Sequence, residues 1–124
     1  MSETGSLGRP FMQQALLLEL WDQAPALVFV ADAERRYLAV NATVCEVLGY
    51  TRAELLQLRV TDVAVADNAD ALYDDMVEAG RQAGRTRIRA KDGTMYAFNY
   101  SARECTIAGL TYYISVGFVG TDSV

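Results

Sequence analysis

The densest pattern of apolar and polar positions lies between Phe29 and Leu56, where short apolar runs alternate with turn and cap residues. Two runs, Phe29-Val30-Ala31 and Tyr37-Leu38-Ala39-Val40, are rich in the β-branched and aromatic residues typical of strands. The residues between them, 32–36, are mostly polar and predict the turn of a hairpin. This segment therefore predicts two neighbouring antiparallel strands.

Two short helices are predicted directly after this hairpin. Asn41 is a suitable N-cap, because its side-chain oxygen can accept hydrogen bonds from the N–H groups of a first helical turn. The apolar surface of that helix is formed by Val44, Cys45, Val47 and Leu48. Gly49 supplies the left-handed residue that ends it. Thr51 and Glu54 have the spacing of a capping box, which starts a second helix ending at Leu55-Leu56.

The second half of the chain predicts one longer helix followed by three strands. Asp67-Asn68 can cap a helix over about 69–82, whose apolar face is formed by Leu72, Met76, Ala79 and Ala83. Strict alternation from Arg85 to Lys91 predicts a strand with its basic side chains on one face and Thr86, Ile88 and Ala90 on the other. Asp92-Gly93 is a strong hairpin turn, and strands over 94–106 and 110–119 follow it, joined by a turn at Ala108-Gly109.

A further helix is predicted before the first strand. Residues 1–9 are small and polar and are predicted to be disordered, whereas Pro10 suits the first turn of a helix within 10–24. Apolar side chains lie on nearly every side of this helix, so two of its sides must be buried. One side could cover the sheet, and the other would remain a patch that meets a partner. We therefore predict a dimer interface formed by Phe11, Leu17, Leu18 and Trp21.

The order of these signals resembles that of a PAS domain. Asn41 closes the second strand, Gly49-Tyr50 closes the first short helix, and Lys91-Asp92-Gly93-Thr94 precedes two long apolar strands. The resemblance implies a PAS core over 25–122 with an α+β fold, in which short helices cover one face of a five-stranded antiparallel sheet. It also implies that the flanking helix pairs two copies. An attached effector domain is implied too, although Asp122-Ser123-Val124 departs from the Asp-Ile-Thr ending that often leads to one.

Composition narrows the class of function. Hydrophobic residues make up 52% of the 124 residues and charged residues 22%, as in one soluble domain. The longest apolar runs, 15–18 and 24–31, are too short to cross a membrane, and no signal peptide is evident. Two cysteines are too few for a disulfide framework, so a reducing cytoplasm is expected. The net charge of −5 argues against nucleic acid as a partner.

The absence of histidine removes the usual general base and the commonest ligand of metals and haem. Ser101 and Ser115 have no histidine to activate them, so we expect no catalysis, no metal site and no haem. A photochemical flavin is disfavoured because residues 57–63 lack the cysteine of light-sensing relatives of PAS domains, whereas a redox-sensing flavin stays open. The basic residues between Arg81 and Lys91 are expected to form a solvated face.

The predicted core is apolar and aromatic with few polar groups, which is typical of a pocket for a small apolar ligand, fatty-acid-like or aromatic. Matching the strands to the PAS pattern points a set of side chains inward with Thr86: Leu27, Phe29, Ala31, Val44, Leu48, Leu72, Met76, Ile88, Phe98, Tyr100, Ala102, Ile114, Val116 and Phe118. Tyr100 is the best candidate to orient a ligand, because a buried hydroxyl needs a partner. We expect a sensor of the bacterial signalling type. A filled core would instead indicate a ligand-free dimerisation scaffold.

Overall fold

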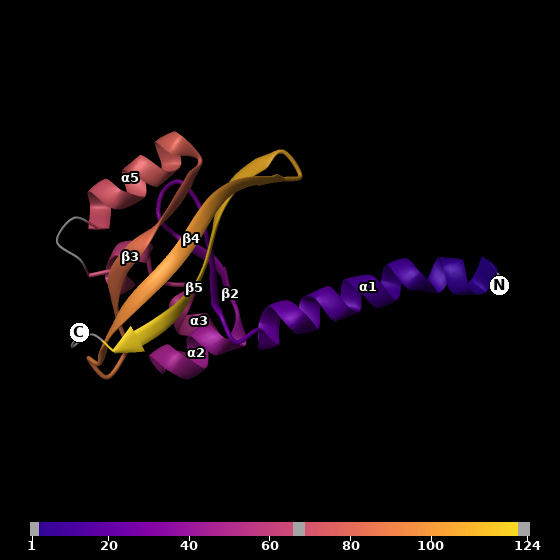
Figure 1. The fold of residues 1–124 in the computed structure, drawn as a ribbon, viewed down its shortest axis with the longest axis horizontal. Coiled ribbons are helices and arrows are strands. Elements are labelled where there is room, and N and C mark those ends of the chain that lie inside the picture. Colours follow the sequence, from indigo (N-terminus) through magenta and orange to yellow (C-terminus); the bar gives the residue numbers. More distant parts are fainter. Residues whose placement is uncertain (1–2, 66–68, 122–124) are drawn as a thin grey trace.

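The computed structural model of the chain describes residues 3–65 and 69–121, which form a five-stranded antiparallel sheet with helices around it (Figure 1). The strands lie in the order β2-β1-β5-β4-β3. Their bounds are β1 Leu27–Ala31, β2 Tyr37–Val40, β3 Arg81–Arg89, β4 Met95–Ile107 and β5 Leu110–Thr121. The predicted α+β fold is therefore confirmed, with the long β4–β5 hairpin at its centre.

The described residues contain α1 Glu3–Gln23, α2 Ala42–Leu48, α3 Arg52–Leu55, α4 Val60–Val63 and α5 Ala69–Ala79. The two short capped helices form where the sequence predicts them. Asn41 caps α2 and Gly49 ends it at φ 78°, while Thr51 and Glu54 make both hydrogen bonds of a capping box at α3. Because caps and left-handed glycines satisfy the backbone locally, these boundaries follow from the sequence alone.

The core lies between one face of the sheet, here called the inner face, and the helices that connect β2 to β3. The helix α2 packs on β1, and α5 packs on β3 and β4. The most completely buried apolar side chains come from β1, β2 and the short helices: Leu27, Val40, Val44, Leu48, Leu55 and Val63. This packing fixes the short helices against the inner face of the sheet.

Two element boundaries differ from the prediction. Helix α1 begins at Glu3 instead of Pro10, so the predicted disorder of residues 1–9 does not match the structure from Glu3 onward. Proline keeps a helical φ, so the helix continues through it with the loss of one backbone hydrogen bond. Strand β3 begins at Arg81, because Gly80 ends α5 early in the left-handed conformation, at φ 77°. The predicted cap at Asp67-Asn68 lies outside the described residues.

Asn41 joins α1, β1 and α2 through one completely buried side chain. Its Oδ1 accepts from the N–H groups of Val28 and Val44, at 3.1 and 3.2 Å. Its Nδ2 donates to the carbonyl oxygens of Trp21 and Ala26, at 3.0 and 2.9 Å. The amide therefore uses all four of its hydrogen-bonding positions. These bonds set the direction in which α1 leaves the sheet.

Beyond this junction α1 projects away from the rest of the chain (Figure 1). Its large apolar side chains are each at least 53% exposed: Phe11, Met12, Leu16, Leu17, Leu18 and Leu20. An isolated helix that exposes so much apolar surface gains little stability from its own sequence. Among the described residues, no helix is both long and apolar enough to cross a membrane.

Candidate functional site: a cavity under the sheet

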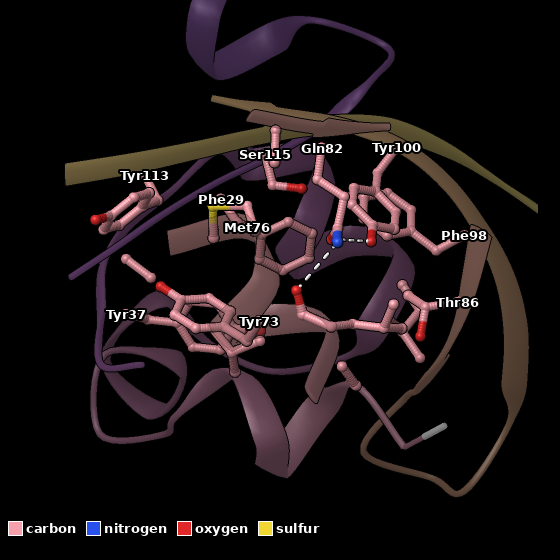
Figure 2. A pocket seen from close by; sticks show the side chains of 16 residues that line it. Phe29, Tyr37, Tyr73, Met76, Gln82, Thr86, Phe98, Tyr100, Tyr113 and Ser115 are labelled. Carbon is pink, nitrogen blue, oxygen red and sulfur yellow. Dashed lines mark hydrogen bonds between the residues drawn. The ribbon is translucent and has the colours of Figure 1, made fainter. Parts of the chain in front are cut away.

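A cavity of about 90 Å³ lies between the inner face of the sheet and the helices α4 and α5 (Figure 2). Its walls come from all five strands, these two helices and the residues next to them. The lining side chains are Phe29, Ala31, Tyr37, Val60, Ala64, Leu72, Tyr73, Met76, Gln82, Thr86, Ile88, Phe98, Tyr100, Ala102, Tyr113 and Ser115. Most are apolar or aromatic, and none is an acid, a lysine or an arginine.

The register of the sheet decides which strand residues reach the cavity, because directly paired residues share a face. Gln82, Ala102 and Ser115 form one row across β3, β4 and β5. The next row consists of Gly84, Tyr100 and Gly117. Tyr100 therefore has glycine as its neighbour on both adjoining strands, and its hydroxyl lies over Gly84. This arrangement leaves room for the phenol on the inner face.

Aromatic rings form one wall of the cavity. The ring of Phe29 meets that of Phe98 edge to face, with centroids 5.7 Å apart, and lies 5.4 Å from that of Tyr37. The rings of Phe98 and Tyr100 stack with centroids 5.7 Å apart. Such contacts add to the stability gained from burying the rings and restrict their motion.

Three of the polar lining side chains lie on β3 and β4: Gln82, Thr86 and Tyr100. The Tyr100 hydroxyl donates to Gln82 Oε1 at 2.6 Å, and Gln82 Nε2 donates to the Leu72 carbonyl of α5 at 3.1 Å (Figure 2). Gln82 thus links β4 to α5. Thr86 Oγ1 is buried and has no hydrogen-bond partner within the described residues. A buried hydroxyl without a partner is uncommon in native proteins and calls for an explanation.

Tyr73 fastens α5 to the turn between β1 and β2. Its hydroxyl donates to the Asp32 carbonyl at 2.6 Å. The guanidinium of Arg35 lies 5.3 Å from the centroid of the Tyr73 ring and pairs with Asp74 at 2.5 Å. These contacts close the side of the cavity that faces the turn.

The phenols of the cavity remain uncharged at neutral pH. Burial is the main cause that raises the pKa of Tyr37, Tyr73, Tyr100 and Tyr113 above the ordinary value for tyrosine. The remaining lining residues have no ionisable side chain. The cavity as a whole therefore carries no formal charge at neutral pH. Its polarity therefore comes from hydroxyl and amide dipoles.

Most residues predicted to point into the core do line the cavity: Phe29, Ala31, Leu72, Met76, Thr86, Ile88, Phe98, Tyr100 and Ala102. Their role in binding a ligand stays a prediction. Leu27, Val44 and Leu48 are buried in the core but do not line the cavity.

The prediction for β5 was wrong by one residue. Val116 and Phe118 are 38% and 59% exposed on the outer face, and Ile114, which has the same parity, shares that face. Tyr113 and Ser115 line the cavity instead. Because both faces of β5 carry apolar residues, its hydrophobic pattern does not indicate which face is buried, and a slip of one residue reverses every assignment.

The sequence did contain the signal needed to assign β5. A two-residue turn at Ala108-Gly109 pairs Ile107 with Leu110, and counting outward from that pair places Ser115 opposite Ala102. Gln82 was missed because the predicted helix extended over it, and Tyr73 was not predicted to line the cavity. Tyr37, Val60 and Ala64 were also missed, since neither the loops nor β2 indicated a contact with the cavity.

Gly117 tolerates no side chain, and we expect Gly117→Ala to lower the free energy of unfolding by about 1–3 kcal/mol. An added Cβ would lie 2.1 Å from the Asn99 carbonyl oxygen and 2.8 Å from a ring carbon of Phe98, so the two strands would have to separate. Urea unfolding measures the change. Gly120→Ala is the control on the same strand, because nothing lies within 4 Å of its added Cβ. Equal effects of the two substitutions would contradict this explanation.

Comparisons with known proteins agree on the fold. The sequence model of the family described as PAS domain matches residues 25–122. The PAS domain of an HTR-like protein from Haloarcula marismortui has a TM-score of 0.81 at 17% identity, covering 94% of this chain and 99% of that one. A PAS domain from a two-component sensor histidine kinase has a TM-score of 0.79 at 18% identity, covering 90% and 99%.

A third structure is a domain of a sensory box sensor histidine kinase/response regulator from Geobacter sulfurreducens. Its TM-score is 0.72 at 24% identity, with 86% of this chain and 94% of that one covered. No curated protein matches the chain in sequence. At these identities the structural neighbours support the shared fold alone.

Proposed function

We propose that this chain, which belongs to the PAS domain family, senses a small molecule in its cavity and passes the bound state to an attached effector domain. In this proposal the chain acts in the cytoplasm as a homodimer and carries out no catalysis. Two of the similar structures come from sensor histidine kinases, proteins in which a sensory domain accompanies an output module. The PAS fold alone does not identify a ligand, so the argument rests on the site.

One observation supports the proposal. Strand β1, which lines the cavity, is connected through the hydrogen bonds of Asn41 to α1, the helix that projects from the domain. Phe29 and Ala31 of β1 line the cavity. Val28, the neighbour of Phe29, donates its backbone N–H to Asn41, and Asn41 donates to the Trp21 carbonyl of α1. A change in the packing of Phe29 therefore has a short, hydrogen-bonded route to α1.

The mechanism requires two arrangements of this route. A ligand shifts the balance between them only if it binds one arrangement more tightly than the other. Occupation of the cavity would move Phe29 and its ring neighbours, and β1 would carry the displacement to Asn41. The angle of α1 would then differ between the empty and occupied states.

We propose that α1 forms the dimer interface. Leu18 and Trp21 line a groove with Leu38 and Leu56, so this side of α1 lies toward its own domain. At 100° per residue, Leu16 and Leu20 project from roughly the opposite side of the helix. Together with Met12 they form an apolar stripe at helical spacing, which suits pairing with a second copy. Of the four interface residues predicted from the sequence, Phe11, Leu17 and Leu18 are exposed, whereas Trp21 is partly buried at the domain end.

The volume of the cavity limits the size of the ligand that it can hold. Sites for drug-sized molecules occupy about 300–1,000 Å³, and this cavity has about 90 Å³. A flavin ring system or a fatty-acid chain does not fit without a large movement of α5, so neither is proposed. The small volume also favours one alternative, a dimerisation scaffold whose core is nearly filled.

Native mass spectrometry of the purified protein separates these two functions. We expect the wild-type chain to carry a bound small molecule that Ala102→Leu lacks, because the larger side chain fills the cavity beside Gln82 and Ser115. Ala83→Leu on the exposed side of β3 is the control and should retain the bound mass. A dimer free of ligand in all three proteins, with Ala102→Leu more stable than wild type, would indicate the scaffold.

A further inference from the structure

The cavity offers no counter-charge to an ionised ligand. All of its lining residues are neutral. Arg35, which lies over the ring of Tyr73 and is paired with Asp74, is not part of the lining. A carboxylate or ammonium group buried here would lose its hydration without gaining an opposite charge, which costs several kcal/mol in protein interiors. The geometry therefore disfavours ionised ligands.

The cavity contains a buried hydroxyl group, that of Thr86, which has no hydrogen-bond partner among the described residues. Its neighbours on the inner face are Phe98 across the strand pair and Ile88 along β3, and neither can accept a hydrogen bond from it through a side chain. The other polar groups of β3 and β4, Gln82 and Tyr100, already bond to each other (Figure 2). The Thr86 hydroxyl is thus the natural anchor for a ligand oxygen.

The volume of the cavity limits the number of atoms that a ligand can have. A dry, apolar cavity of about 150 Å³ accepts benzene. The cavity here is smaller, at about 90 Å³. Met76, whose unbranched side chain lines the wall, can adjust by a small amount. The ligand therefore has no more than about six non-hydrogen atoms.

We propose that the cavity binds a small neutral molecule with one oxygen acceptor, such as a ketone, an aldehyde, an ether or an alcohol. The Thr86 hydroxyl donates to that oxygen, and the carbon skeleton lies against Phe29, Phe98 and Met76. This inference rests on the proposed sensory function and specifies the chemical class of the ligand. It excludes carboxylic acids as well as molecules without a polar atom.

Three probes of nearly equal size test the class. Cyclopentanone is neutral and has a carbonyl oxygen, methylenecyclopentane replaces that oxygen with carbon, and isobutyrate is an anion. Titrations followed by protein-observed NMR, with the backbone signals of β3 and β4 as reporters, give the affinities. We expect cyclopentanone to bind with a Kd on the order of 1 mM, and the other two probes to bind at least about tenfold more weakly.

Two substitutions at Thr86 test the anchor. Thr86→Val keeps the shape of the side chain and removes the hydroxyl, so cyclopentanone should bind about tenfold more weakly. Thr86→Ser keeps the hydroxyl and should retain most of the affinity. Neither variant threatens folding, since Thr86→Val removes an unpartnered polar atom from a buried position. Ala102→Leu should abolish binding and so establishes that the probe enters the cavity.

The outcomes separate this inference from the function on which it rests. Tight binding of isobutyrate or methylenecyclopentane, or unchanged affinity in Thr86→Val, overturns the ligand class while the cavity remains a binding site. If no probe binds but native mass spectrometry finds a bound molecule, the class is again wrong and the sensory function stands. If neither experiment finds a ligand, both proposals fail and the Thr86 hydroxyl serves at most a water molecule.

Discussion

Replacement of Asn41 by alanine is expected to lower the free energy of unfolding by about 4 kcal/mol. The loss leaves the N–H groups of Val28 and Val44 and the carbonyl oxygens of Trp21 and Ala26 without their partner. Each buried group left unpaired costs about 1–3 kcal/mol. The groups near the end of α1 recover part of this free energy by forming hydrogen bonds with water. Removal of the α2 cap is included in the total.

Two measurements check this prediction. Urea unfolding gives the change in stability. The fluorescence of Trp21, the only tryptophan in the chain, reports the environment of the α1 end and should shift to longer wavelength as the junction opens to water. Thr51→Ala is the matched control, because it removes the cap of α3 at an exposed position and should cost only about 1 kcal/mol. An Asn41→Ala protein that is no less stable than Thr51→Ala would show that the buried junction contributes only a cap.

The second large effect concerns the dimer. We expect the double substitution Leu16→Glu with Leu20→Glu to weaken self-association at least about 1,000-fold, because each leucine contributes about 1.5–3 kcal/mol when fully buried. Burial of the new charges would add a further penalty. The stripe that carries both residues faces away from the groove that holds Leu18 and Trp21, so the domain itself should fold normally. Sedimentation over a range of protein concentrations gives the association constant.

The control makes the same chemical change at another apolar site. Ile107 and Leu110, paired at the tip of the β4–β5 hairpin, are 57% and 59% exposed. In Figure 1 this tip extends to the same side of the domain as α1 but is separate from it. Ile107→Glu with Leu110→Glu should leave the dimer intact. Dissociation in this variant and not in the α1 variant would move the interface to the hairpin and the outer face of the sheet.

The local elements of the fold were predictable because short-range chemistry defines them. The cap at Asn41, the left-handed Gly49 and the capping box of Thr51 and Glu54 each act within one turn of chain. The same holds for the hairpin turns, whose residues fix the conformation directly. These signals follow one another in the order and at the spacing seen in PAS domains. That match was sufficient to predict the α+β architecture.

The candidate site was predicted only in part. The inward position of Thr86 on β3 followed from alternation, and those of Phe29, Phe98 and Tyr100 on β1 and β4 followed from the match to the PAS pattern. The inward face of β5 did not, since the strand is apolar on both sides and only its pairing with β4 distinguishes Ser115 from Val116. The hydrogen-bond partner of Tyr100 could not be predicted either, because Gln82 lies 18 residues away in sequence.

The sequence by itself determined the order of strands, turns and helices, that the core is apolar and aromatic, and that α1 carries apolar side chains on nearly every side. The tertiary structure decided the rest: that Gln82 holds Tyr100, that Thr86 lacks a partner among the described residues, and that the cavity left by the packing is about 90 Å³. The physical reason is the distance along the sequence between the residues that interact. Caps and turns depend on neighbouring residues, whereas a cavity is what remains after side chains from distant segments have packed together.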